Sequence, residues 1–186
     1  MAMTLPHRMT VEEFIDASAG VQRPAELIDG VMVVSQPRFR HQDAVARILV
    51  ALRAWSDGAN GRGAASLPLD VELDDHNVYG PDVLWYRDIA DIEMDGFQQR
   101  VPDLVVEVRS PSTWHYDVGV KRRTYEYFGL PELWLVDTDA GEVRVLRRSG
   151  PDAVGFDVEL KIGCDEVLTS PQLPGFELPL DDVFRF

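Results

Sequence analysis

The chain has 186 residues, of which 45% are hydrophobic and 27% charged, a composition typical of one soluble globular domain over residues 1–186. Its net charge of −14 argues against a protein that binds nucleic acid through overall positive charge, although arginines do gather locally at 38–40, 122–123 and 147–148. A single cysteine, Cys164, excludes an intrachain disulfide and predicts a cytoplasmic location, and no secretory signal or membrane-spanning apolar stretch is evident.

The N-terminal region predicts a short helix followed by a β-hairpin. Thr10 and Glu13 have the spacing of a capping box, which begins a helix, and Gly20 marks its end. Asp29-Gly30 separates two apolar runs within residues 25–34. Because both residues tolerate the backbone of a tight turn, these runs are expected to pair as antiparallel strands.

The middle of the chain predicts one helix and several strands. Apolar residues recur at helical spacing from His41 to Trp55. Residues 67–73 resemble a strand interrupted by a proline, and a turn is expected at 75–77. Two short apolar runs, Gly80–Trp85 and Pro102–Val108, then predict neighbouring buried strands.

The C-terminal half predicts a second helix at 116–128, ended by a glycine and a proline, and strands at 132–136, 143–146 and 156–160. The strand at 143–146 is expected to form an exposed edge and a candidate dimer contact. The tail from Pro171 is expected to pack on the body through its apolar residues, which are Phe176, Leu178 and Phe184. This order of elements predicts an α/β fold, with helices packed against a sheet.

Each of the two central apolar runs carries a carboxylate, Asp82 in the first and Glu107 in the second. Burying a carboxylate costs several kcal/mol unless it is paired or holds a metal. Side chains alternate along a strand, so Asp103, Glu107 and Arg109 are expected on one face. Carboxylates on adjacent strands offer the oxygen ligands that Mg²⁺ prefers, and Mn²⁺ is an acceptable substitute. The pattern therefore favours a hydrolytic metal site.

The second long helix adds a positive charge to this site. Lys121 lies on one helical stripe with Val118, Tyr125 and Phe128, so it is expected to point toward the sheet. A lysine near a bound phosphate stabilises developing charge or helps to orient the attacking water. The alternative is purely structural: Asp82 caps a turn, and Glu107 forms a buried salt bridge with an arginine or with Lys121. Three charged groups on one buried face favour the metal site.

Other polar residues receive structural interpretations. For His41, a local hydrogen bond at a helix start is favoured over a contact with phosphate or Glu26, and Asp117 is expected to cap the helix of Lys121. For Tyr125, packing in the core is favoured over a hydrogen bond to a site carboxylate, and Asp103 is expected at a strand edge. Ser110 and its neighbours lack the His and Asp partners of a serine hydrolase.

The order of several motifs resembles the Uma-type putative restriction endonucleases, a bacterial family of the PD-(D/E)xK nuclease superfamily. The resemblance covers nearly the whole chain. The motifs that carry it are Met9–Phe14, Glu26–Gly30, His41-Gln42, Pro81–Val83, Asp103–Thr113, Asp117, Lys121, Tyr125 and Gly129–Asp137. The resemblance implies a restriction-endonuclease-like core, which is a central mixed β-sheet flanked by α-helices.

The same resemblance implies the site residues and the function. It places metal ligands at Asp82 and Glu107 and adds Glu26 as a candidate third ligand. Arg109 stands where the superfamily has its lysine, and the lysine looks displaced to Lys121. The implied activity is a Mg²⁺-dependent DNA endonuclease that hydrolyses phosphodiester bonds with a metal-activated water. Duplex DNA is the expected partner, and a homodimer the expected assembly.

Two alternatives stay open at the level of sequence. One is a non-catalytic binding or assembly protein that retains the nuclease fold, which the acidic charge and Arg109 favour. The other is a phosphodiesterase of the same fold that acts on RNA or nucleotides. Fold alone does not decide between them.

Overall fold

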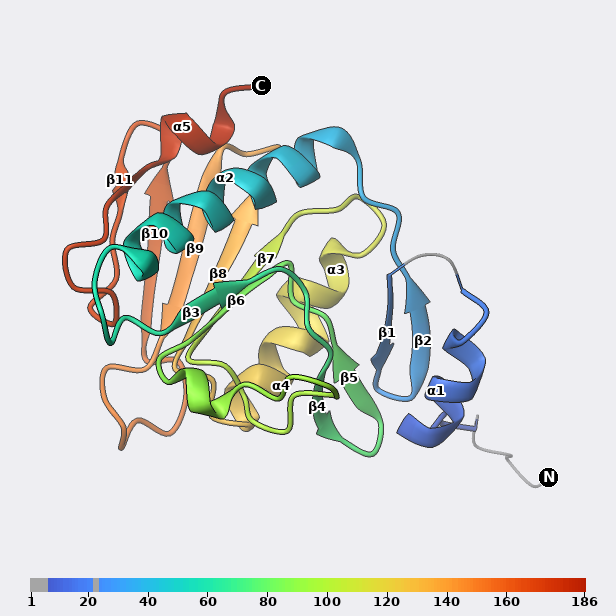
Figure 1. Ribbon diagram of the computed structural model, residues 1–186. Coiled ribbons are helices and arrows are strands. Elements are labelled where there is room, and N and C mark those ends of the chain that lie inside the picture. The colour runs from blue at the N-terminus through green and yellow to red at the C-terminus, as the bar shows by residue number, and fades with distance from the viewer. Residues whose placement is uncertain (1–6, 22–23) are drawn as a thin grey trace.

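The computed structural model describes residues 7–21 and 24–186, and its centre is a six-stranded mixed sheet (Figure 1). The strands lie in the order β10-β9-β8-β7-β6-β3, and β7 and β8 are the one parallel pair among them. This arrangement confirms the predicted central mixed sheet. The strands are β3 (Ala64–Ser66), β6 (Val83–Tyr86), β7 (Leu104–Val108), β8 (Glu132–Asp137), β9 (Glu142–Arg147) and β10 (Val158–Gly163).

A second sheet of four strands, in the order β2-β1-β5-β4, lies beside the first. Its hairpin pairs β1 (Ala25–Ile28) with β2 (Val31–Val34), as the sequence predicts. Asp29 and Gly30 both have positive φ, at 52° and 76°, which the tight turn requires. The remaining strands are β4 (Val71–Asp74) and β5 (Asn77–Tyr79). The helix α1 (Val11–Ser18) packs on this sheet. The capping box predicted at its N-terminus is confirmed.

Helices cover both faces of the six-stranded sheet. On one face lies α2 (Phe39–Asp57), and on the other lie α3 (Trp114–Tyr116), the π-helical turn η2 (Asp117–Lys121) and α4 (Arg122–Tyr127). Alternate residues of β7 point to opposite faces. Its even-numbered residues pack with α2, and Val105 packs with the core residues under α4. The predicted alternation along this strand is therefore confirmed. None of the described helices is both long and apolar enough to cross a membrane.

The structure corrects three expectations about the strands. Residues 67–73 do not form one strand: β3 ends at Ser66 and β4 begins at Val71, because Pro68 has no N–H for the ladder. Asn77 begins β5 instead of lying in a turn. The strand at 143–146 is β9, an interior strand, because β10 covers it and forms the edge.

The C-terminal tail packs on the face that α2 covers, as predicted. Phe176 and Leu178 are buried there, and Phe184 is partly buried. The C-terminal region also contains two short paired strands, β11 (Val167–Leu168) and β12 (Leu178–Pro179), and the helix α5 (Leu180–Phe184). Elsewhere in the chain, a 3₁₀ turn, η1 (Ile89–Asp91), precedes β7.

A buried carboxylate ties the tail to the sheet. Glu132, at the start of β8, is fully buried and accepts hydrogen bonds from Trp134 Nε1 (2.6 Å) and Ser170 Oγ (2.8 Å). Ser170→Ala removes one donor from this charge, so we expect it to lower the free energy of unfolding by about 1–3 kcal/mol. Urea denaturation measures the loss. The matched control is Ser112→Ala on the surface, which should change stability by less than about 0.5 kcal/mol; equal effects of the two would contradict the prediction.

Candidate active site

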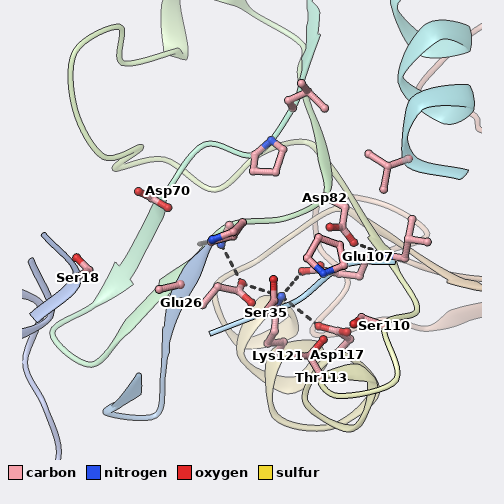
Figure 2. Close-up of a pocket in the computed structure, with 18 of the residues that line it drawn as sticks. Ser18, Glu26, Ser35, Asp70, Asp82, Glu107, Ser110, Thr113, Asp117 and Lys121 are labelled. Carbon is pink, nitrogen blue, oxygen red and sulfur yellow. Dashed lines mark hydrogen bonds and ion pairs between the residues drawn. The ribbon is translucent and has the colours of Figure 1, made fainter. Parts of the chain in front are cut away.

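The two antiparallel strands β6 and β7 bring Asp82 and Glu107 together (Figure 2). Val83 pairs with Val106, so Asp82, one residue earlier, lies at the position opposite Glu107. Asp82 Oδ2 accepts a hydrogen bond of 2.7 Å from Val108 N, which fixes its carboxylate against β7. Glu107 is buried, and Asp82 is half-buried at the pocket wall.

Lys121 lies at the centre of a group of carboxylates. Its Nζ is 2.7 Å from Glu107 Oε1, 2.8 Å from Glu26 Oε1 and 3.1 Å from Asp117 Oδ1. Its side chain is 2% exposed, so the predicted inward orientation is confirmed. Lys121 ends the π-helical turn η2, and such turns are frequently found at functional sites.

Glu26 comes from the other sheet, so the site lies where the two sheets meet. It sits on β1, and its Oε1 accepts hydrogen bonds from Lys121 Nζ and from Gly80 N, the latter at 2.9 Å. The backbone just before Asp82 therefore holds Glu26 in place. The structure brings together all four residues that the sequence selects for the site, which are Glu26, Asp82, Glu107 and Lys121.

His41 belongs to this site, although the sequence predicts a local role for it. Its Nε2 is 3.2 Å from Asp82 Oδ1 and its Nδ1 is 3.1 Å from Val108 O. Both acceptors can be satisfied together when both ring nitrogens carry protons. Burial lowers the pKa of His41, but the hydrogen bond and charge of Asp82 outweigh it and raise that pKa above its usual value. The ring thus holds Oδ1 of Asp82, while the backbone of β7 holds its Oδ2.

Asp117 also belongs to the site, and its predicted role as a helix cap is wrong. The cap position is Thr113, and Asp117 lies one turn inside the continuous helical segment, four residues before Lys121. That spacing places both side chains on one helical face. Tyr125, one turn further on, is buried as expected, and its hydroxyl donates a hydrogen bond of 2.8 Å to Glu107 Oε1.

Arg109 points elsewhere. It forms ion pairs with Asp137 (2.8 Å) and Asp139 (3.2 Å), beyond the end of β7, and it does not line the pocket. Asp103, at the other end of β7, accepts a hydrogen bond from Arg87 N, in keeping with its predicted structural role. Of the two candidates for the cationic role, the one that lies among the carboxylates is Lys121.

The cluster carries more negative than positive charge. Four carboxylates surround one lysine and one histidine. Burial raises the pKa of Glu107 well above its usual value; Lys121 opposes this rise, and the charges of Asp117 and Glu26 add to it. Burial likewise raises the pKa of Asp117 to about 6, against the effect of Lys121. The site therefore favours the gain of further positive charge.

A pocket of about 890 Å³ opens onto this cluster. Asp70 also lines it, and burial together with the charge of Glu26 raises the pKa of Asp70. The pocket is also lined by apolar residues from α1 and from two loops, which include Phe14, Ile15, Leu67, Pro68 and Phe97. The pocket thus combines an acidic end with an apolar wall.

The donor set fits a hard divalent cation, although its side chains are not gathered as a finished metal site. No three His, Cys, Asp or Glu side chains within residues 7–21 and 24–186 are arranged to hold an ion. Lys121 Nζ forms an ion pair with one oxygen of each of Glu26, Glu107 and Asp117. No hydrogen bond from the described part of the chain reaches the second oxygen of these three carboxylates. Such oxygens are the ligands that Mg²⁺ accepts.

The central mixed sheet flanked by helices is a restriction-endonuclease-like nuclease fold, and the carboxylates and Lys121 lie at its centre. The chain belongs to the Uma2 family, described as "Putative restriction endonuclease", which it matches over residues 11–181. It is also similar to a crystal structure described as a putative nuclease belonging to DUF820, from Anabaena variabilis ATCC 29413. The two share 19% identity and a TM-score of 0.76, over 95% of this chain and 98% of the other. No curated protein matches the chain.

Proposed function

We propose that this protein is a Mg²⁺-dependent endonuclease that hydrolyses phosphodiester bonds of DNA. The observation that carries the proposal is the surplus of carboxylates around Lys121 in an open pocket. A purely structural ion pair needs one carboxylate for one lysine, and each extra buried carboxylate costs free energy. The family description supports nuclease chemistry for this cluster.

Asp82, Glu107 and Glu26 are the residues that would hold the cation. When bound, Mg²⁺ would lower the pKa of a water and neutralise charge on the phosphate. The residues around them have positioning roles: His41 and the backbone of β7 fix Asp82, and Tyr125 fixes Glu107. The ligands are thus held by partners on several elements, which limits their movement.

Lys121 acts in this proposal as a positive charge. Burial lowers its pKa, but Glu107, Glu26 and Asp117 outweigh that effect and raise the pKa well above its usual value. Its three ion pairs therefore suit an ammonium that supplies positive charge to the site. Its ammonium can stabilise negative charge that develops on the phosphate oxygens during hydrolysis.

Duplex DNA is the proposed substrate and a homodimer the proposed assembly. The family description, restriction endonuclease, supports DNA as the substrate. Two strands of opposite polarity present two equivalent bonds, which a two-fold dimer matches with two sites. The protein's charge of −14 means that binding relies on the bound cation and on local basic residues, since overall attraction is absent.

Cleavage of supercoiled plasmid tests the proposal directly. Purified protein with Mg²⁺ or Mn²⁺ should nick or linearise the plasmid, and EDTA should stop the reaction. An Asp82→Ala variant should be inactive while its circular dichroism spectrum stays native. Cleavage that persists in EDTA or in this variant would refute the assignment of the site.

One observation favours the alternative of a non-catalytic protein. Lys121 already pairs with one oxygen of each of three carboxylates, and no group of side chains among the described residues is arranged to hold a metal ion. This alternative predicts no plasmid cleavage and no heat of binding when Mg²⁺ or Mn²⁺ is titrated into the protein by calorimetry. A phosphodiesterase of the same site that acts on RNA or nucleotides would bind the metal but leave plasmid intact.

A further inference from the structure

One edge of the six-stranded sheet is formed by β10, which lies far from the second sheet (Figure 1). The inner side of β10 pairs with β9 along its whole length. Among the described residues, no backbone hydrogen bond from another segment reaches the outer side of β10 between 158 and 162. An edge of this kind is ready to pair with another strand.

The sequence of β10 is complementary to itself. When two copies pair antiparallel about a two-fold axis at Leu160, Glu159 of one faces Lys161 of the other, and Val158 faces Ile162. Each charge thus meets an opposite charge, and each apolar residue meets another. A shift of the axis by one residue would place Glu159 against Glu159 or Lys161 against Lys161, and like charges directly opposite each other are destabilising, so the register is specified.

The two faces of β10 suit the same pairing. Leu160 pairs with Val145 and Ile162 with Val143, so both lie on the apolar face that α2 covers. Leu160 is 39% exposed, and pairing would cover it with its own counterpart. Glu159 and Lys161 lie on the other face, where they already form ion pairs with β9. A second copy would extend this row of alternating charges.

The other edge strands of the two sheets are less suited to pairing with a second copy. The opposite edge of the sheet, β3, has three residues. The edge strand β2 of the second sheet has an exposed Val31 but no charged residue that would fix a register. A lysine on an edge strand usually prevents pairing. In the antiparallel pairing described above, Lys161 of one copy faces Glu159 of the other, so the lysine on β10 favours pairing.

We propose that β10 is the dimer interface of this protein, where two copies pair antiparallel about Leu160 into one continuous sheet. The proposal specifies the surface of the homodimer in the proposed function. It rests on that proposed homodimer and is tested by mass and not by cleavage, so its failure is distinguishable from a failure of the nuclease assignment. A monomeric wild type would remove the homodimer from the proposed function but leave the chemistry of the pocket untouched.

Charge reversal at two positions provides the test. Wild type should have twice the 20.9 kDa chain mass in sedimentation or light-scattering measurements. Lys161→Glu places glutamates opposite glutamates, and Glu159→Lys places lysines opposite lysines, so each should weaken dimerisation at least about tenfold. An equimolar mixture of the two variants restores opposite charges on both sides and should form a heterodimer.

The mixture also controls for damage within each chain, because the altered ion pairs to β9 are the same alone and mixed. Val31→Lys, on the edge of β2, should leave the dimer intact. Four results would overturn the proposal: a monomeric wild type, single variants that dimerise like wild type, a mixture that stays monomeric, or a dimer that Val31→Lys dissociates.

Discussion

Glu107→Gln should lower DNA cleavage at least about 10³-fold, which corresponds to about 4 kcal/mol of transition-state stabilisation. The amide keeps the shape of the carboxylate, and its oxygen can still accept a hydrogen bond from Tyr125. What it loses is the negative charge that a divalent cation requires. The rate of plasmid nicking in Mg²⁺ measures the effect.

Stability measurements on the same variant separate a functional carboxylate from a structural one. Lys121 keeps Glu26 and Asp117 when Glu107 is neutral. Burial and neighbouring carboxylates both disfavour the charge on Glu107, as its raised pKa indicates. The free energy of unfolding in EDTA should therefore stay the same or increase. A decrease of about 3–5 kcal/mol would instead mark Glu107 as an essential ion-pair partner.

Glu132→Gln is the matched control for this experiment. Glu132 is also a buried glutamate at one end of a central strand, but it lies away from the pocket and binds Trp134 and Ser170. Its substitution should leave cleavage within about twofold of wild type. Equal losses of cleavage in the two variants would show that damage to the fold, and not the loss of a metal ligand, explains the effect.

The fold was predictable where short stretches of sequence determine the backbone. The turn at Asp29-Gly30 and the capping box at Thr10 depend on neighbours within a few residues, and both formed as expected. The alternation along β7 follows from strand geometry, so the shared face of Val105 and Glu107 was also predictable. Pro68 shows the limit: its missing N–H indicated an interruption but not that the chain passes there from β3 in one sheet to β4 in the other.

The composition of the site was only partly predictable, because its contacts join residues that are distant in the chain. Glu26 reaches Lys121 across 95 positions, and only the resemblance to a nuclease family suggested it. His41 meets Asp82 through the packing of α2 on the sheet, which no local pattern reveals. Asp117 was within reach, since its spacing of four residues from an inward-facing Lys121 indicates a shared helical face.

Lys121→Met should strongly reduce both stability and cleavage. The variant leaves Glu26, Glu107 and Asp117 without their ammonium partner in a buried site. Removing one partner of a buried ion pair costs about 3–5 kcal/mol, which urea denaturation in EDTA would measure. Arg185→Met, which breaks an exposed ion pair, should cost less than about 1 kcal/mol.

A second substitution keeps this prediction testable if Lys121→Met alone does not fold. Asp117→Asn in the same chain removes one of the unpaired charges, so the double variant should regain part of the lost stability yet remain inactive. Arg109→Met should cleave like wild type, because Arg109 pairs with Asp137 outside the pocket. An active Lys121→Met protein beside an inactive Arg109→Met protein would move the cationic role to Arg109. The carboxylate cluster would then be a structural network around a buried lysine.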